Sequence, residues 1–179
     1  MKRKHGPWTI TETARMYRHE LIEVFEDQVI KPDGQPGVYA TVKIKEGASV
    51  LALDQDGFVY LTKEFRYALG RESIEVVSGA IDEGERPVEA AQRELREELG
   101  IEAAELIELG RVDPIPSMVD SPSHLFLAVS LKFKDQKQEG SEVIEPVKVK
   151  LEDAVRMAIS GEITHGSSCV LILRANSYL

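Results

Sequence analysis

One segment of this 179-residue chain predicts a helix with defined ends. Pro87 lacks a backbone N–H and has a φ angle suited to a first helical turn, whereas Gly100 suits a C-terminal stop. Between them, apolar residues recur at spacings of three and four, at Val88, Ala91, Leu95 and Leu99. We therefore expect a helix whose apolar stripe is buried against the rest of the fold.

Most other patterned segments alternate apolar and polar residues or are short apolar runs, which predicts strands. Two pairs of such segments flank the turn sequences Lys31-Pro32-Asp33-Gly34 and Asp54-Gln55-Asp56-Gly57 and predict hairpins. The predicted strands are 21–30, 38–44, 49–54, 58–62, 74–77, 104–112 and 124–133, and further helices are predicted at 152–159 and 163–175. This order of elements predicts an α+β sandwich of mixed sheets.

The predicted helix also carries a group of acidic residues. Glu94 lies three and four residues before Glu97 and Glu98, so the three carboxylates share one stripe of the helix. Their mutual repulsion calls for a cation, and oxygen ligands without a thiolate or paired histidine favour a hard ion, Mg²⁺ or Mn²⁺. Arg93, one turn before Glu97, is placed to hold that carboxylate while the others bind metal.

Composition limits the classes of partner and compartment. A net charge of −9 argues against nonspecific binding to nucleic acid or to an anionic membrane. Cys169 is the single cysteine, which excludes a disulfide framework and makes a reducing compartment, the cytoplasm, the expected location. No apolar run approaches the ~20 residues of a membrane helix, and the polar start of the chain does not read as a secretion signal.

A longer pattern includes this helix. Gly79, Glu85, Arg93-Glu94-Leu95, Glu97-Glu98 and Gly100-Ile101 match G-x5-E-x7-R-E-U-x-E-E-x-G-U, where U is bulky and apolar. The pattern resembles the signature box of the Nudix hydrolases, which cleave a nucleoside diphosphate linked to another group. The competing interpretation is a Glu-rich surface helix, but so many identities in register have a chance probability on the order of 10⁻⁵ or lower.

The resemblance extends beyond the box. Segments 61–67, 70–72, 74–75, 124–128, 144–145, 151–154 and 160–163, together with Pro116, are similar to the ADP-ribose and nucleotide-sugar pyrophosphatase branch. It implies the Nudix α/β/α sandwich of mixed sheets with an N-terminal β extension. We accordingly expect an extension with a β-hairpin at residues 1–45, forming part of a dimer interface, and a Nudix hydrolase domain at 46–179.

The resemblance also implies roles for individual residues. Glu94, Glu98 and Glu97 would bind the metal together with the backbone carbonyl of Ser78, and Glu85 would be an outer ligand or orient one. Arg66 would contact the substrate diphosphate, because a guanidinium makes bidentate bonds to phosphate oxygens. The alternative for Arg66 is a surface arginine paired with Glu64 or Glu75. Further substrate contacts are expected from Arg71 and Glu75.

The general base is where the sequence departs from the branch. Relatives of the ADP-ribose type often carry a glutamate about five residues after Pro116, and here that position is Ser121. Asp120 and Glu142 are the candidate bases, although each is equally compatible with an ordinary loop charge. The changed loop makes a broader or different nucleotide-sugar preference plausible.

Aromatic residues able to stack on a base are scarce. Trp8 and Tyr17 lie in the N-terminal extension, which in this branch commonly exchanges with a partner subunit, so a homodimer with composite sites is expected. Both are more often simple packing anchors. His124 is expected as a core or edge histidine, and no partner is recognisable for His165.

The expected function is Mg²⁺-dependent hydrolysis of the diphosphate of a nucleoside diphosphate sugar, giving a nucleoside monophosphate and a sugar phosphate. One alternative is a hydrolase of nucleoside triphosphates or dinucleoside polyphosphates. The other is a non-catalytic Nudix sensor that binds a nucleotide. The three carboxylates favour an enzyme, because a pure binder has no need to tolerate their repulsion.

Overall fold

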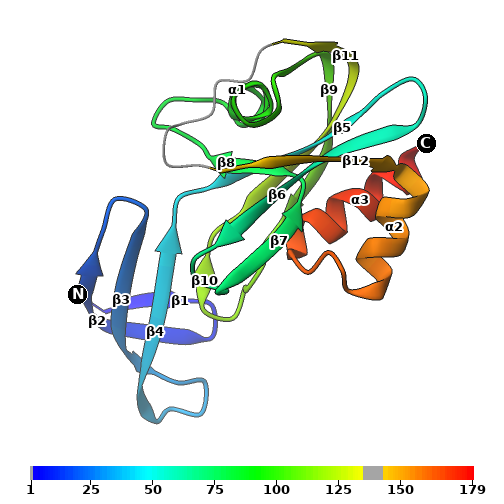
Figure 1. The fold of residues 1–179 in the computed structure, drawn as a ribbon. Coiled ribbons are helices and arrows are strands. Elements are labelled where there is room, and N and C mark those ends of the chain that lie inside the picture. The colour runs from blue at the N-terminus through cyan, green and yellow to red at the C-terminus, as the bar shows by residue number, and fades with distance from the viewer. Residues whose placement is uncertain (1, 135–142) are drawn as a thin grey trace. The chain divides into compact units, whose positions relative to one another are not determined.

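The computed structural model describes residues 2–134 and 143–179, and the chain divides into two compact units (Figure 1). The first consists of Met1–Lys45 and Asp113–Ser121, and the second of Glu46–Val112 and Pro122–Leu179. The segment Asp113–Ser121 was expected in the second domain. It joins the first unit because its short strand pairs with a strand there, a long-range contact that periodicity does not reveal.

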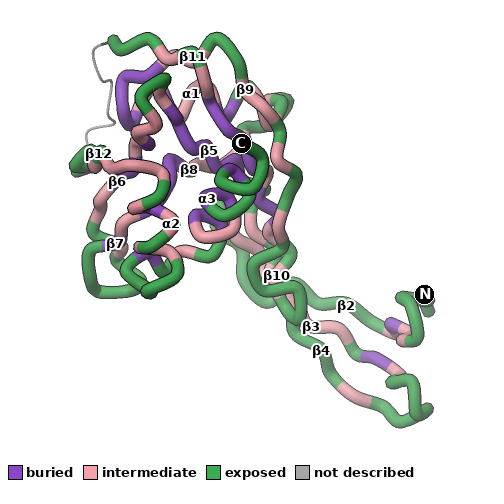
Figure 2. Tube along the Cα trace, turned by 90° about the vertical axis from the view of Figure 1, so that its right-hand side faces the viewer, coloured by how far each residue is buried: buried purple, intermediate pink, exposed green. Residues whose placement is uncertain are grey.

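The first unit is a five-stranded sheet with the order β1-β2-β3-β4-β10. The strands are β1 (Arg3–His5), β2 (Trp8–Arg18), β3 (Ile22–Ile30), β4 (Pro36–Ile44) and β10 (Val119–Asp120). The pair β3 and β4 confirms the first predicted hairpin, and Gly34 takes a positive φ of 86° in its turn. The strand β2 was not predicted, and two register shifts against β3 interrupt its alternation. Most of this unit is exposed (Figure 2), and Ile10 and Val29 are its buried apolar residues.

The second unit is built on a sheet with the order β12-β6-β5-β11-β9, to which β7 and β8 add at β6 and β5. Its strands are β5 (Gly47–Leu53), β6 (Phe58–Arg66), β7 (Arg71–Glu75), β8 (Val77–Ala80), β9 (Ile101–Val112), β11 (Ser123–Phe133) and β12 (Glu145–Lys150). Its helices are α1 (Pro87–Leu99), α2 (Leu151–Ser160) and α3 (Gly166–Tyr178). The pair β5 and β11 is parallel and the other pairs are antiparallel, so the sheet is mixed.

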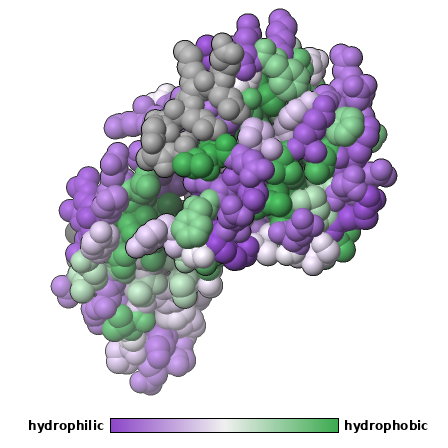
Figure 3. Space-filling model, viewed as in Figure 1, coloured by the Kyte–Doolittle hydropathy of each residue, from purple (hydrophilic) through white to green (hydrophobic). Residues whose placement is uncertain are grey.

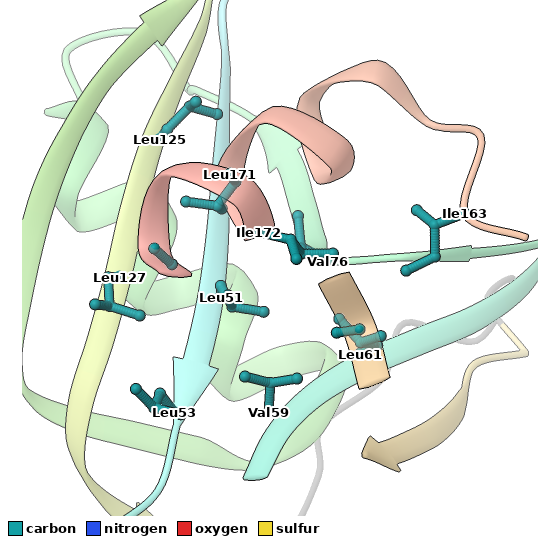
Figure 4. Close-up of a cluster of buried hydrophobic side chains, with 12 residues drawn as sticks. Leu51, Leu53, Val59, Leu61, Val76, Leu125, Leu127, Ile163, Leu171 and Ile172 are labelled. Atoms are coloured by element: carbon teal, nitrogen blue, oxygen red, sulfur yellow. The ribbon is translucent and has the colours of Figure 1, made fainter. Parts of the chain in front are cut away.

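Helices cover both faces of this sheet, and the alternation along β5 shows why. Val50 and Ala52 belong to the apolar cluster that includes Leu95 of α1, whereas Leu51 and Leu53 belong to a second cluster with α2 and α3. Strand β11 divides its residues between the same two clusters. Figure 4 shows the second cluster, in which side chains of α3 lie against β5 and β11. The predicted α/β/α sandwich is therefore confirmed, and both central strands are apolar because both of their faces are buried.

The ends of α1 agree with the sequence pattern. Arg86 precedes the helix, and its backbone N–H donates to Glu89 Oε2 at 3.0 Å. Gly100 ends the helix with a φ of 64°, a conformation that glycine adopts without strain. The four residues of the predicted stripe all contact the first apolar cluster.

Three other elements differ from the sequence expectations. The last helix begins at Gly166 rather than at residue 163. The predicted strand 74–77 is two strands, because β7 pairs with β6 while β8 crosses to β5. Strand β12 was missed; its Pro146 gave no strand signal, yet it pairs along β6. Among residues 2–134 and 143–179, we find no helix with the length and apolar character needed to span a bilayer.

Candidate active site

Arg93 is the centre of the acidic site on α1. Its Nε and Nη2 donate to the two oxygens of Glu85 at 2.9 and 3.0 Å, and Nη2 also donates to the carbonyl of Ala80 at 3.0 Å. Its Nη1 donates to Glu94 Oε1 at 2.6 Å and to Glu97 Oε2 at 3.3 Å. These contacts can use all five N–H groups of a guanidinium. Arg93 therefore ties the loop before the helix to two of the predicted metal-binding carboxylates.

The hydrogen bonds between Arg93 and Glu85 keep both side chains ionised. The pKa of Glu85 is lowered, first by its hydrogen bonds from Arg93, and the pKa of Arg93 is raised, first by the same bonds. The predicted ion pair between Arg93 and Glu97 is present, but Arg93 also binds Glu94 and Glu85. The cation that offsets the clustered carboxylates in this structure is thus Arg93 itself.

Gly79 makes room for Glu94. A Cβ built on Gly79 would lie 2.0 Å from both Cδ and Oε1 of Glu94, which is closer than atoms can approach. The neighbouring Ser78 lies in β8 opposite Ser49 of β5, with its hydroxyl donating to the Ser49 hydroxyl at 2.9 Å. The side chain of Glu94 therefore lies against the backbone segment that was predicted to supply a carbonyl ligand.

The carboxylates of α1 have the chemistry that a hard divalent ion needs, but their side chains do not converge on a single point in this structure. Within the described ranges, no three acidic, histidine or cysteine side chains are grouped so that they could hold a metal ion. Glu94, Glu97 and Glu98 offer carboxylate oxygens on one side of α1, and Glu98 is buried. Beside Gly79, the Glu94 carboxylate occupies a space that the side chain of a larger residue would fill. Binding of an ion there requires the Glu94 and Glu97 side chains to share their oxygens between it and Arg93.

Arg66 lies at the end of β6 in the same unit. Its Nε and Nη2 donate to the two oxygens of Glu75 at 3.2 and 2.9 Å, and its Nη1 lies 2.7 Å from Glu64 Oε2. Burial alone would lower the pKa of Arg66, but the carboxylates of Glu75 and Glu64, with a smaller effect from Glu98, raise it. The competing interpretation, an arginine paired with Glu64 or Glu75, thus describes its contacts here.

Those contacts leave Arg66 able to bind a further anion. Three of its five N–H groups are used by carboxylates of the described residues, which leaves one N–H on each terminal nitrogen. Its side chain keeps 36% of its surface exposed. Pairing with Glu75 and binding of a phosphate are therefore compatible.

Arg71 and Glu75 have different surroundings. Arg71 is exposed and donates from Nη2 to Thr164 Oγ1 at 2.8 Å and from Nη1 to the carbonyl of Glu72 at 3.2 Å. Glu75 is buried, which by itself would raise its pKa, but the hydrogen bonds from Arg66 and the nearby His165 lower it. Glu75 therefore accepts the hydrogen bonds that hold the Arg66 guanidinium in this structure.

His165 was missed by the sequence analysis, which found no partner for it. Its Nδ1 lies 2.8 Å from Ser168 Oγ and 3.4 Å from Glu75 Oε2. The spacing of three residues at the start of a helix brings the His165 and Ser168 side chains near one another, which is the one signal in the sequence for this contact. The contact with Glu75 depends on the fold alone. His124, as expected, is a half-buried strand residue, and its Nε2 lies 3.3 Å from Glu46 Oε2.

Of the two candidate bases, the structure describes only Asp120. Asp120 is exposed in β10 and belongs to the first unit, where it is paired with Lys43 of β4. Glu142 lies outside the described residues. Asp120 and the α1 carboxylates therefore belong to different units.

The predicted aromatic contacts also belong to the first unit. Trp8 packs edge-on against Tyr39, with ring centroids 5.4 Å apart, at a hollow of about 700 Å³. Arg3 and Asp27 are among the polar residues that line the hollow. Tyr17 is half-exposed on β2 and is not one of the lining residues. Apolar side chains are visible among polar ones on the face shown in Figure 3.

Comparison with known proteins decides the family. The model of the NUDIX domain matches residues 43–166, which is more than half of the chain. The protein is a member of the Nudix family. This match includes the Gly79-to-Ile101 box and Arg66, so the site described above lies inside the Nudix domain.

Individual relatives agree with this assignment. The Nudix chain is 31% identical over 151 residues to an ADP-ribose pyrophosphatase of Bacillus subtilis (strain 168), covering 83% of this chain and 82% of the relative. It is 27% identical over 154 residues to an ADP-ribose pyrophosphatase of Mycobacterium tuberculosis (strain ATCC 25618 / H37Rv), covering 84% and 74%. A crystal structure of an ADP compounds hydrolase shares its fold with a TM-score of 0.85 at 21% identity, covering 99% of this chain and 96% of the other. The protein is therefore a Nudix pyrophosphohydrolase.

Proposed function

We propose that this Nudix enzyme hydrolyses the diphosphate of a nucleoside diphosphate sugar in a Mg²⁺-dependent reaction, with ADP-ribose as the first candidate substrate. The names of the two relatives and of the structural neighbour support an ADP compound. The observation that carries the proposal is the set of hydrogen bonds from Arg93 to Glu85, Glu94 and Glu97, which orders the carboxylates of the Nudix box. Arg66 supports it, because its guanidinium keeps two N–H groups that neither Glu75 nor Glu64 uses and that can bind phosphate oxygens.

The reaction breaks one P–O bond of the diphosphate bridge. The oxygen of a water molecule adds to one phosphorus, the bridging oxygen leaves with the other phosphate, and the proton passes to a base. Arg66 binds oxygens of the leaving phosphate and offsets the charge that develops there. Arg93 orients Glu94 and Glu97, and Glu85 in turn orients Arg93.

Glu94, Glu97 and Glu98, with the carbonyl of Ser78, are the residues proposed to hold the metal. Mg²⁺ or Mn²⁺ at such a site lowers the pKa of a coordinated water and polarises phosphate oxygens. Asp120 and Glu142 remain the two candidates for the base. The Nudix box by itself supplies a further candidate, because any of its carboxylates not engaged by the metal can accept a proton.

The nucleoside is proposed to contact the first unit. Trp8 lines a hollow large enough for a nucleoside, and the indole face can stack on a base. Tyr17 is retained as a second candidate contact. Exposed apolar residues on the sheet of this unit, among them Met16, Tyr17 and Val38, support a homodimer. We also propose a cytoplasmic location, because the single Cys169 suits a reducing compartment.

A product assay tests the substrate proposal. The purified protein is incubated with ADP-ribose, ADP-glucose, GDP-mannose, UDP-glucose and dGTP in Mg²⁺, in Mn²⁺ and in EDTA. We expect AMP and ribose 5-phosphate from ADP-ribose, with no product in EDTA. Preferential hydrolysis of dGTP would favour the nucleoside triphosphate alternative. Binding of ADP-ribose without turnover under any metal condition would favour a non-catalytic sensor and contradict the proposal.

A further inference from the structure

His165 connects the start of α3 to the carboxylate that holds Arg66. Its Nδ1 lies 3.4 Å from Glu75 Oε2, and the same oxygen accepts the hydrogen bond from Arg66 Nη2 at 2.9 Å. The imidazole and the guanidinium therefore meet at one carboxylate oxygen. Glu75 keeps only 7% of its side-chain surface exposed, so this oxygen is largely withdrawn from water.

Ser168 contacts the same ring nitrogen of His165. Its Oγ lies 2.8 Å from His165 Nδ1 and accepts the backbone N–H of Val76 at 2.9 Å. Ser168 is fully buried in the first turn of α3, and Val76 is the residue that follows Glu75. The ring of His165 is thus anchored to the backbone next to Glu75 as well as to its carboxylate.

The hydrogen on the imidazole follows from its neighbours. An ionised carboxylate can only accept hydrogen bonds, so a favourable contact with Glu75 requires the hydrogen of a neutral imidazole to be on Nδ1. Ser168 Oγ can accept from the same N–H. Burial lowers the pKa of His165 below its ordinary value; the Glu75 carboxylate acts against this, and the Arg66 guanidinium adds to it, so the neutral ring is favoured. The Nδ1–H tautomer is therefore the one that the site favours.

The contact matters because two carboxylates hold Arg66 and both contribute to its orientation. Glu64 binds Nη1 at 2.7 Å from the strand that also carries Arg66, whereas Glu75 lies on the neighbouring strand β7. Because the guanidinium is planar and rigid, its orientation depends on where both carboxylates are held. The same loop before α3 also holds Arg71, through Thr164 Oγ1 at 2.8 Å.

We propose that His165 is a positioning residue, which fixes the Glu75 carboxylate and through it directs the free N–H groups of Arg66 toward the substrate diphosphate. The inference rests on the proposed function for the role of Arg66. Within the part of the chain that the structure describes, the side-chain polar contacts of His165 are with Ser168 and Glu75, neither of which is a proposed metal ligand. Its side chain makes no hydrogen bond to the backbone of α3 among the described residues, so capping of that helix does not account for it.

Three substitutions test the Nδ1 contact. The amide nitrogen of His165→Asn lies the same number of bonds from Cα as Nδ1, whereas that of His165→Gln corresponds to Nε2, and His165→Ala has neither. We expect His165→Asn to retain most of the parent's kcat/KM and its affinity for a non-hydrolysable methylene analogue of ADP-ribose. His165→Gln and His165→Ala should lose both by about 10-fold, the size of effect that supporting hydrogen bonds of a site commonly have.

A double-mutant cycle with Arg66→Ala separates positioning from general stability. If His165 acts through Arg66, His165→Ala should cause no further loss of analogue affinity once Arg66 is removed. Losses that add independently would overturn the proposal. His124→Ala is the matched control, because His124 also pairs with a glutamate in this unit and should leave kcat/KM unchanged. Urea unfolding of each variant shows whether stability alone accounts for a loss.

The outcomes distinguish this inference from the proposed function. A parent enzyme that hydrolyses ADP-ribose while His165→Gln and His165→Ala match it would refute the positioning role alone. A parent that neither hydrolyses nor binds any nucleoside diphosphate sugar would refute both. An NMR measurement of the imidazole nitrogens gives a readout without substrate, and a hydrogen found on Nε2 rather than Nδ1 would also overturn the inference.

Discussion

The Cα of Gly79 faces the carboxylate of Glu94 so closely that a Cβ would lie 2.0 Å from Oε1. The backbone of Gly79 does not have a positive φ, so its requirement for glycine is one of space and not of conformation. Gly79, the first residue of the Nudix pattern, thus leaves space for Glu94, which lies fifteen residues later in the same pattern.

Gly79→Ala should therefore damage the site while preserving the fold. The displaced atoms are the end of a flexible side chain, so we expect the free energy of unfolding to change by less than about 1 kcal/mol. Activity should fall about 100-fold, because the Glu94 carboxylate moves from its place. Mn²⁺ affinity and ADP-ribose turnover are the measurements. Gly47→Ala is the control, since its Cβ would make an ordinary contact of 3.4 Å, and equal losses in the two variants would contradict the explanation.

Arg93→Lys should reduce activity even though the charge is kept. An ammonium has three donors and cannot reproduce the two parallel bonds to Glu85 together with the bonds to Ala80, Glu94 and Glu97. We expect a loss of about 10–100-fold in kcat. Arg96→Lys, on the same helix and with a looser contact of 3.6 Å to Glu102, should retain activity. Full activity of Arg93→Lys would show that the paired hydrogen bonds of the planar guanidinium are not needed.

Glu98→Gln tests the proposed metal role directly. The amide keeps the size of the buried side chain but removes its charge, so kcat in Mg²⁺ should fall by orders of magnitude while far-UV circular dichroism stays the same. Glu152→Gln, an exposed position at the start of α2, is the control and should behave as the parent. Parent-like turnover of Glu98→Gln would remove this carboxylate from the mechanism.

Stability should rise with pH in two acid windows. The folded pKa of Glu75 lies below its ordinary 4.5, so its contribution is present above that pH and is lost as the pH falls through the folded pKa. The folded pKa of His165 lies below its ordinary 6.5, so the unfolded chain takes up the proton first and stability falls as the pH drops below 6.5. Urea unfolding from pH 2.5 to pH 8 measures both. In His165→Asn, the free energy of unfolding should depend less steeply on pH just below pH 6.5. An unchanged slope would show that His165 does not cause this pH dependence.

The general base is open to a direct comparison. Asp120→Asn and Glu142→Gln are made separately, and the variant that removes the base should lose about 10²–10⁴-fold in kcat, with the acid limb of the pH–rate profile altered. KM should change little, because the proton transfer occurs only in the chemical step. If neither variant slows hydrolysis, both candidates are excluded and a carboxylate of the Nudix box becomes the remaining choice.

The sequence by itself determined the features that depend on near neighbours. The ends of α1 follow from Pro87 and Gly100, its buried face follows from spacings of three and four, and the two hairpins follow from their turn residues. The Nudix pattern lies mostly within one helix and the turn before it. Such features are encoded locally, because the residues that specify them are within a few positions of one another.

Only the tertiary structure decided the contacts that cross between elements. Whether Arg66 meets Glu64, Glu75 or both depends on the register of β6 against β7, and the contact of His165 with Glu75 joins residues of two elements far apart in the chain. The parallel pairing of β10 with β4, which moves Asp120 into the first unit, is of the same kind. No local pattern records these contacts, because they arise from which strands pair and which helix covers which face.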